Sequence, residues 1–360
     1  MRNQVSDNVF AKALGRGASG NPKGRFLAHE KEALDTGWQI EEGPVLRTEL
    51  RHERARKIIT RNRSPDLSFD RSINPYRGCE HGCIYCFARP SHAFIDLSPG
   101  LDFETKLTVK PNAPDALEKE LSHPRYRPQV MAIGTNTDPY QPVELRTGVM
   151  RKCLKVLRDF RHPVAITTKG ALIERDIDIL SEMAAEGLAS VGISVTTLDP
   201  ALARKMEPRV PSPARRLASI RRLSDAGIPV RVCASPMIPG LTDHELEAIL
   251  EAGARAGARA ASWVMVRLPF EVAQLFRDWL EREVPGQAAK VIGRVREAHG
   301  GKDYDPAWHK RMRGEGLYAQ MIAQRYKVAT GRLGLADDMP QLRTDLFRVP
   351  PRPGDQLTLF

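Results

Sequence analysis

The chain has 360 residues, 41% of them hydrophobic and 28% charged, and its formal net charge is +11. No apolar run approaches the roughly 20 residues that a membrane-spanning helix needs, and the first residues lack the apolar segment of a signal peptide. We therefore expect a cytoplasmic protein without a membrane segment, in which clustered cysteines indicate metal binding or catalysis rather than disulfides. The positive charge is of the kind that attracts nucleic-acid phosphates, although an arginine-rich surface without such a partner is the alternative.

Residues 1–65 are expected to form a basic arm and lead-in. They include GRGASGNPKGRF, residues 15–26, which is rich in glycine and has no apolar periodicity. In residues 66–270, apolar segments alternate with amphipathic ones. The segments expected as strands are 72–78, 130–135, 164–168, 189–195, 229–235 and 262–268. The segments expected as helices are 112–122, 143–160, 171–187, 199–226 and 243–257.

Strands separated by helices in this order predict repeated βα units and a parallel sheet. Six units are too few for a closed eight-stranded barrel, so we expect an α/β fold with a partial barrel or an open sheet. In both arrangements the chemistry lies at the carboxyl ends of the strands. Residues 271–338 are expected to form a helical extension with an amphipathic helix near 307–330, and residues 339–360 a Pro-rich tail.

Three of the five cysteines, Cys79, Cys83 and Cys86, follow the first expected strand with the spacing C-x3-C-x2-C. A closed zinc site needs four ligands, and the fourth would have to be His81, His92 or a distant group. An iron–sulfur cube held by three cysteines instead leaves one iron open to another ligand. The residues alone leave both kinds of site open.

With an aromatic residue just before the last cysteine, this spacing resembles the signature of the radical S-adenosylmethionine (radical SAM) superfamily. The resemblance implies a [4Fe–4S] cluster whose open iron is chelated by the amino and carboxylate groups of S-adenosylmethionine. One electron, from a reductant such as flavodoxin or ferredoxin, then releases a 5'-deoxyadenosyl radical that abstracts hydrogen from a substrate. It also implies a partial (β/α)6 TIM-like barrel, with the N-terminal arm and C-terminal helical extension outside it.

Motifs at the strand ends resemble the branch related to spore photoproduct lyase and to DNA repair photolyases. These motifs are GTNTDPYQPVE (134–144), TTKG (167–170), SVTTLD (194–199) and ASPMIPGLTD (234–243). The resemblance implies a radical enzyme that acts on damaged DNA or another nucleic acid. A radical enzyme that modifies a protein or small molecule and a zinc-stabilised interaction module remain as alternatives.

The resemblance also implies which residues would contact the cosubstrate, namely Tyr85, Asn136, Thr137, Asp138, Lys169, Ser194 and Arg209. Tyr85 would line the adenine site, and residues 136–138 would meet the methionine amino group, largely through the backbone. Lys169 and Arg209 would approach the carboxylate, while Ser194 would bond the same moiety or the ribose. Each also has a structural alternative, such as a buried ring for Tyr85 or a surface cation for Lys169. The nearby arginines Arg215, Arg216, Arg221 and Arg222 are expected on the solvent face of a helix.

Spore photoproduct lyase returns hydrogen to its product from a cysteine just ahead of the Asp-Pro pair. Here Thr135 stands in that place before Asp138, and a hydroxyl O–H bond is too strong to serve as this donor. We therefore do not predict spore photoproduct repair. Cys233, at the end of the fifth expected strand, is the candidate catalytic thiol, with a small buried apolar residue as its alternative.

The last five residues, QLTLF, follow a Pro-rich segment. They resemble the motif by which bacterial polymerases and repair proteins bind the DNA sliding clamp, with Gln356 in a polar subsite and Leu357, Leu359 and Phe360 as apolar contacts. A weaker match is RTDLF, residues 343–347. A tail that folds back onto the barrel is the alternative.

Overall fold

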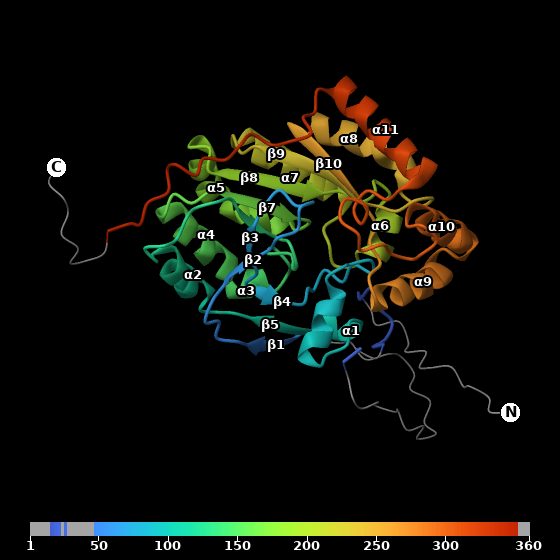
Figure 1. Ribbon diagram of the computed structural model, residues 1–360, viewed down its shortest axis with the longest axis horizontal. Coiled ribbons are helices and arrows are strands. Elements are labelled where there is room, and N and C mark those ends of the chain that lie inside the picture. Colours follow the sequence, from blue (N-terminus) through green and yellow to red (C-terminus); the bar gives the residue numbers. More distant parts are fainter. Residues whose placement is uncertain (1–14, 23–24, 27–46, 352–360) are drawn as a thin grey trace, which may run out of the picture.

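The computed structural model describes residues 15–22, 25–26 and 47–351, and its centre is a seven-stranded sheet with the order β10-β9-β8-β7-β6-β3-β2. Six of these strands are parallel and follow the chain order, while β2 runs antiparallel beside β3. Because β2 and β10 stay apart at the two edges, the sheet is an open partial barrel, as predicted (Figure 1). The strands are β2 Ile59–Arg61, β3 Arg71–Ile73, β6 Met131–Ile133, β7 Val164–Thr168, β8 Ala189–Ser194, β9 Val230–Met237 and β10 Ala260–Met265.

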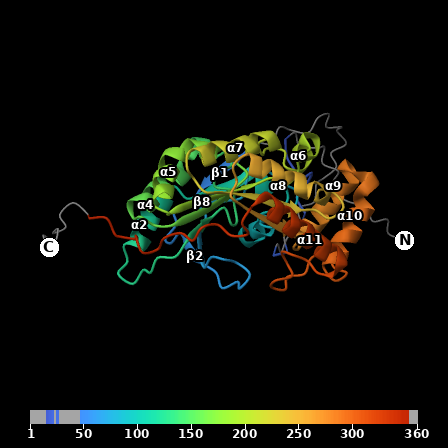
Figure 2. The ribbon, with the colours of Figure 1, turned by 90° about the horizontal axis from the view of Figure 1, so that it is seen from above.

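Helices cover one face of this sheet, and α4, α5, α7 and α8 follow one another along it (Figure 2). Alternate strand residues such as Ile166, Val191 and Val232 are buried against these helices and form the main core. The helices between strands are α2 Ala113–Leu121, α3 Glu144–Thr147, α4 Val149–Asp159, α5 Ile177–Ala185, α6 Pro200–Met206, α7 Pro213–Asp225 and α8 Leu246–Arg255. Short 3-10 turns, η2 Ala171–Asp176 and η3 Asp243–Glu245, precede α5 and α8.

Two of the expected helices are interrupted. The helix expected over 199–226 is wrong as a single element, because Pro208 and Pro211 lie between α6 and α7 and cannot donate backbone hydrogen bonds. Ser212 then starts α7 by accepting a hydrogen bond from a backbone N–H of the first turn. The helix expected over 143–160 divides at Gly148, where the backbone enters the left-handed region with φ of 61°.

A second, three-stranded sheet was not expected. It has the order β1-β5-β4 and consists of β1 Glu49–His52, β5 Lys106–Val109 and β4 Tyr76–Arg77. The strand expected over 72–78 therefore divides into β3 and β4, one in each sheet, around Pro75. Two short helices, η1 Arg89–Ile95 and α1 Leu101–Thr105, connect β4 to β5.

The C-terminal third adds α9 Glu271–Glu283, α10 Pro285–Ala298 and α11 Gly316–Leu333. The helix expected from residue 307 begins only at Gly316, because Gly314 and Gly316 adopt positive φ of 70° and 84° there. Among the described helices, none combines the length and the apolar character needed to cross a membrane.

The described part of the tail returns from α11 toward the α5 side of the sheet (Figure 1). The ring of Phe347 packs against Tyr126, Phe160 and His162, with centroid distances of 5.5, 6.2 and 5.6 Å. The expectation that 343–347 echoes a docking motif is therefore not supported, because its Leu-Phe pair packs on this chain's own core. The stronger match, residues 356–360, lies outside the described residues.

We expect Phe347→Ala to lower the free energy of unfolding by about 1–3 kcal/mol, because it removes a ring from a half-buried aromatic cluster. Val349→Ala, two residues along the same segment and exposed, is the matched control and should change it by less than about 0.5 kcal/mol. Urea unfolding followed by circular dichroism measures both. Equal effects of the two substitutions would contradict this packing of the tail.

Candidate metal centre and cosubstrate site

The three clustered cysteines lie in the loop between β4 and η1, near the carboxyl end of β3. Backbone hydrogen bonds curl this loop, from Gly82 N–H to Cys79 O at 3.4 Å and from Cys86 N–H to Cys83 O at 3.2 Å. Cys79 and Cys83 are buried, Cys86 is half-buried, and all are free thiols. Each of the first two is close enough to Cys86 to interact with it electrostatically. The loop thus gathers three sulfur ligands in one small region.

The donor set fits an iron–sulfur cube better than a single ion. Within the described residues, no three ligating side chains converge as one metal ion would require. A cube instead bonds each cysteine through a different iron, and three cysteines leave one iron open. Burial raises the pKa of Cys83 most, and the negative charge of Glu207 raises it further. The Cys83 thiolate therefore needs nearby cations of the kind that bound irons provide.

A buried ion pair holds the cysteine loop from behind. The Arg89 and Glu104 side chains are fully buried, with Nη2 of the arginine 2.6 Å from Oε1 of the glutamate. The same guanidinium donates hydrogen bonds to the carbonyl oxygens of Gly82 at 3.2 Å and Cys83 at 3.0 Å. Since these contacts lie between the first and last cysteines, the ion pair fixes the backbone that sets the spacing of the sulfurs.

Part of the segment predicted as an N-terminal arm packs against this loop. The backbone N–H groups of Gly17 and Ala18 donate to the two carboxylate oxygens of Glu104, at 3.0 and 2.9 Å. A side chain at residue 17 would place its Cβ only 1.9 Å from the carbonyl oxygen of Gly82, so glycine is required for the close approach. Residues 15–22 therefore form a backing layer for the cysteine loop.

Asp138 ties the loop after β6 to its neighbours. Its carboxylate accepts hydrogen bonds from Lys169 N–H at 2.8 Å and from the Thr168 hydroxyl at 2.5 Å, and it lies 3.4 Å from Nδ1 of His81. Burial acts to raise the pKa of Asp138, but His81 and these hydrogen bonds together lower it to about 2. The Asp138 backbone also hydrogen-bonds Cys79. The loop predicted to meet the cosubstrate therefore touches the cysteine loop.

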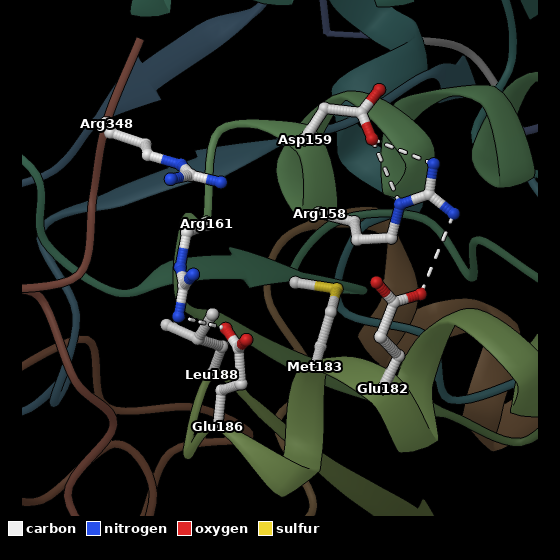
Figure 3. A pocket seen from close by; sticks show the side chains of 8 residues that line it. All are labelled: Arg158, Asp159, Arg161, Glu182, Met183, Glu186, Leu188 and Arg348. Atoms are coloured by element: carbon white, nitrogen blue, oxygen red, sulfur yellow. Dashed lines mark hydrogen bonds and ion pairs between the residues drawn. The ribbon is translucent and has the colours of Figure 1, made fainter. Parts of the chain in front are cut away.

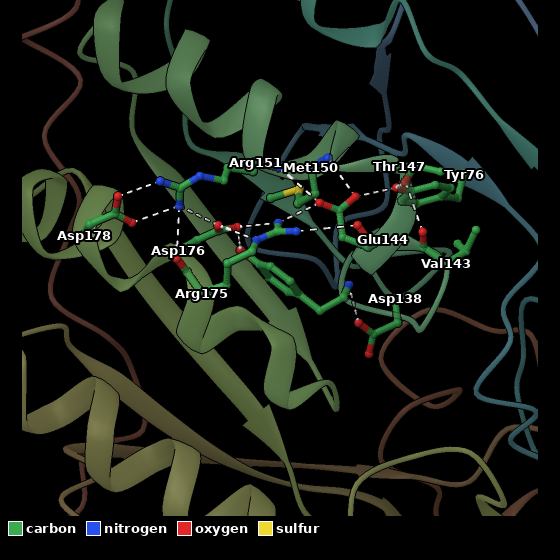
Figure 4. A network of polar contacts seen from close by, with 11 residues as sticks. Tyr76, Asp138, Val143, Glu144, Thr147, Met150, Arg151, Arg175, Asp176 and Asp178 are labelled. Atoms are coloured by element: carbon green, nitrogen blue, oxygen red, sulfur yellow. Dashed lines mark hydrogen bonds and ion pairs between the residues drawn. The ribbon is translucent and has the colours of Figure 1, made fainter.

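A network of buried charges supports Asp138 from the other side (Figure 4). Tyr140 donates its backbone N–H to the Asp138 carboxylate at 2.9 Å and its hydroxyl to Asp176 at 3.2 Å. Arg175 bridges the fully buried carboxylates of Asp176 and Glu144, at 2.9 and 2.7 Å. Removal of one member would leave a buried charge unpaired, so the network makes the loop rigid.

The other predicted residues of this loop are Asn136, which is half-buried, and Thr137, which is buried. The Thr137 hydroxyl donates to the carbonyl oxygen of Tyr76 at 3.4 Å. Arg209 lies after α6, with its guanidinium 3.6 Å from the carboxylate of Glu80 in the cysteine loop. The structure therefore brings both Asp138 and Arg209 into contact with the cysteine loop, at His81 and Glu80.

Tyr85 belongs to a buried polar cluster around Glu207. The carboxylate accepts hydrogen bonds from the Tyr85 hydroxyl, from the Thr196 hydroxyl at 2.8 Å and from Arg216 at 2.7 Å. The Lys169 ammonium lies 5.8 Å from the centre of the Tyr85 ring. Burial acts to lower the pKa of Lys169, but the negative charges of Cys83 and Glu207 outweigh this effect, and the pKa is raised above its usual value. The lysine therefore carries its positive charge beside the cysteine loop.

The expectation that Arg216 lies on the solvent face of its helix is wrong, because its side chain is 1% exposed. It occupies the same face of α7 as Ile220 and Leu223, four and seven residues further on, and this spacing was the available signal. The partner carboxylate of Glu207 compensates the cost of burying the guanidinium. The sequence did not indicate this cluster, because it does not show that Arg216 and Glu207 are partners.

Ser194 and Cys233 are paired across β8 and β9. A Cβ at Gly192 would lie 3.1 Å from the Cys233 sulfur and 3.4 Å from the Thr167 hydroxyl, so these side chains share one face of the sheet. Neighbouring residues such as Val232 face the helices, so Cys233 points to the opposite, inner face. Burial raises its pKa, which keeps the thiol protonated.

A surface pocket of about 330 Å³ lies at the other end of the sheet, where β7 and β8 begin (Figure 3). Arg158 in its wall is 3.8 Å from Glu182, and Arg161 is 2.7 Å from Glu186. Because these cations are neutralised and catalysis in such folds uses the carboxyl ends of strands, we assign this pocket no catalytic role.

Comparison with known proteins agrees with this geometry. Residues 73–253 match the family model described as the Radical SAM superfamily. An uncharacterized protein of Mycobacterium tuberculosis (strain ATCC 25618 / H37Rv) is 37% identical over 265 residues, which cover 73% of this chain and 76% of that protein. An uncharacterized protein of Methanocaldococcus jannaschii is 28% identical over 192 residues, covering 53% of this chain and 69% of that protein.

The fold is similar to solved structures of spore photoproduct lyase. The lyase complexed with dinucleoside spore photoproduct superposes with a TM-score of 0.58 and 14% identity, covering 80% of this chain and 81% of that chain. A variant of the lyase with bound AdoMet and dinucleoside spore photoproduct gives a TM-score of 0.57, again with 14% identity and with 80% of each chain covered. At this identity the likeness shows a common fold.

We expect Arg89→Met to lower the free energy of unfolding by about 3–5 kcal/mol, because it leaves the Glu104 charge buried without its partner. The variant should also retain less iron after reconstitution, since the cysteine loop loses its anchor. The matched control is Arg294→Met, which breaks an exposed pair with Glu297 and should leave the free energy of unfolding nearly unchanged. Urea unfolding of the metal-free protein and iron analysis of the loaded protein test both effects. An Arg89→Met variant as stable as the control would contradict the anchoring role.

Proposed function

Because this chain belongs to the radical SAM superfamily, we propose that its radical chemistry acts on a nucleic acid. The cofactors of the family are a [4Fe–4S] cluster and S-adenosylmethionine, whose reductive cleavage supplies a 5'-deoxyadenosyl radical that abstracts a hydrogen atom. The observation that carries the assignment is the loop of Cys79, Cys83 and Cys86 beside the ends of the six parallel strands.

The chain's own residues would hold and orient the cosubstrate. The three cysteines would ligate the cluster, and Lys169, charged and directed toward the cysteine loop, would bind the methionine carboxylate together with Arg209. Tyr85, fixed by Glu207, would present its ring to the adenine. The remaining contacts in this proposal come from Asn136, Thr137, Asp138 and Ser194. Asp138 would act through its backbone, because its carboxylate is already engaged with Thr168 and Lys169.

Two observations support a nucleic acid as the substrate. The fold is that of a lyase solved with a dinucleoside photoproduct, and the chain carries a net charge of +11. Thr135 stands where the lyase resemblance places a hydrogen-donating cysteine, so the proposal does not include spore photoproduct repair. Cys233, on the inner face of the sheet, is the proposed thiol for any hydrogen return.

Two protein partners are also proposed. A one-electron reductant such as flavodoxin or ferredoxin would reduce the cluster. The DNA sliding clamp would bind Gln356, Leu357, Leu359 and Phe360, which is supported by the sequence of these residues after a Pro-rich segment. Such docking would bring the enzyme to DNA.

Reconstitution under anaerobic conditions should load four irons per chain, and the reduced protein should cleave S-adenosylmethionine to 5'-deoxyadenosine. Cys79→Ala, Cys83→Ala and Cys86→Ala should each abolish both cluster and cleavage, whereas Cys153→Ala, which removes a thiol packed within α4, should retain both. Stoichiometric zinc without cleavage would contradict the assignment.

Deuterium transfer identifies the substrate. Reduced enzyme is incubated with unlabelled S-adenosylmethionine and, in separate reactions, with deuterated DNA, RNA, protein or small-molecule fractions, and the 5'-deoxyadenosine and S-adenosylmethionine are then examined for deuterium by mass spectrometry. We expect deuterium in the adenosyl group only when a nucleic-acid fraction carries the label, because the radical takes its hydrogen from the substrate. Deuterium acquired only from a protein or a small-molecule fraction would replace the nucleic-acid proposal with the alternative class of substrate.

The clamp proposal is tested by titrating the intact protein, a chain lacking residues 356–360 and a Leu359→Ala, Phe360→Ala variant against the purified clamp. Only the intact protein should bind, because the other two lack the apolar contacts. Equal binding by all three would remove the clamp as a partner.

A further inference from the structure

An exposed ring, Phe87, and a half-buried guanidinium, Arg267, form a pair beside the cysteine loop. Phe87 directly follows Cys86 and is 42% exposed, which is unusual for a phenylalanine next to a buried loop. Arg267 comes two residues after β10 and places its Cζ atom 3.8 Å from the centre of the Phe87 ring. The pair therefore joins the first loop of the sheet to the last strand, across its open side.

In the part of the chain that the structure describes, the Arg267 guanidinium has no partner that neutralises it. Within the described residues, none of its nitrogens donates a hydrogen bond and no carboxylate lies within ion-pair distance. Among the charged groups that act on it electrostatically, the positive Arg311 acts more strongly than Asp66, which is itself paired with Arg311 at 2.6 Å. A half-buried guanidinium without a counter-charge is costly, and an anionic ligand would remove that cost.

The surroundings add further aromatic groups that reach solvent. Trp308, 59% exposed, lies on a loop that is attached to β10 by a hydrogen bond from Met265 N–H to Met312 O at 2.8 Å. Phe270, exposed and three residues after Arg267, lies under the Arg25 guanidinium, with 4.2 Å between the Cζ atom and the ring centre. Flat rings interleaved with guanidinium groups can bind stacked bases and phosphates. An acidic protein partner would pair with the guanidinium groups but would not account for the exposed rings.

We propose that Phe87 and Arg267 bind a nucleotide of single-stranded nucleic acid, with an unpaired base stacked on the ring and its phosphate on the guanidinium. The inference rests on the proposed function for its substrate class and adds the place and mode of binding. Since Phe87 is adjacent to Cys86, a nucleotide held there lies beside the cluster loop. A duplex would have to release a base to reach it.

The test is a titration of the intact, cluster-loaded protein, with S-adenosylmethionine but no reductant, against a fluorescent oligothymidylate of about 12 nucleotides at several salt concentrations. The logarithm of affinity should fall linearly with the logarithm of salt. Arg267→Gln should weaken binding and reduce that slope by about 0.7, the share of one phosphate on a single strand. Arg267→Lys keeps the charge and should keep the slope.

Phe87→Leu should weaken binding by about fivefold or more at every salt concentration, with the slope unchanged, because it removes a stacking surface and no charge. Phe87→Tyr keeps the ring and should bind as the natural protein does. Visible absorption shows whether each variant retains its cluster. The charge-matched control is Arg158→Gln, at the far end of the sheet, which should leave affinity within about twofold.

The proposal is overturned if the intact protein does not bind the oligonucleotide, or if Arg158→Gln changes the slope as much as Arg267→Gln. It is also overturned if Phe87→Tyr weakens binding as much as Phe87→Leu. Because no reductant is present, the result is independent of hydrogen transfer. Deuterium transfer from a nucleic acid to the adenosyl group together with equal binding by every variant would contradict this pair alone. Binding through the pair with no deuterium transfer from any nucleic acid would contradict the proposed function alone.

Discussion

The buried ion pair of Arg89 and Glu104 is the contact on which the centre depends. Two charges that are removed from water need hydrogen-bond partners for their polar atoms. Both side chains of this pair have such partners. The arginine holds backbone carbonyls of the cysteine loop, while the glutamate holds the N–H groups of Gly17 and Ala18. One interaction therefore sets the spacing of the sulfurs and fastens a distant segment behind them.

The parallel sheet supplies the rest of the site. Successive strands end side by side, so loops that are far apart in the sequence meet the cysteine loop: Asp138 after β6, Lys169 after β7 and Glu207 beyond β8. Each is held by buried polar partners, which suits a site that must orient a flexible cosubstrate and keep water from a radical. At the open side of the sheet, Phe87 of the cysteine loop meets Arg267, which follows the last strand.

Much of this arrangement was predictable from the sequence. The six parallel strands and the cysteine loop follow from local patterns, because β-rich runs and ligand spacing are read over a few residues. The Arg89–Glu104–Gly17 contact was not predictable, since Glu104 and Gly17 are 87 residues apart and glycine-rich segments have no periodicity. Arg216 was misassigned because charge suggested solvent, although its spacing to Ile220 matched a buried face. The interruption at Pro208 and Pro211 was visible in the sequence but outweighed by the helical pattern on both sides.

Electron paramagnetic resonance of the anaerobically reduced protein, recorded before and after addition of S-adenosylmethionine, tests whether Cys79, Cys83 and Cys86 hold a cluster with one iron open to the cosubstrate. We expect the signal of a reduced four-iron cluster whose g-values shift when the cosubstrate binds the open iron. A cluster signal that stays unchanged at saturating S-adenosylmethionine, or the absence of any such signal in iron-loaded protein, would contradict it.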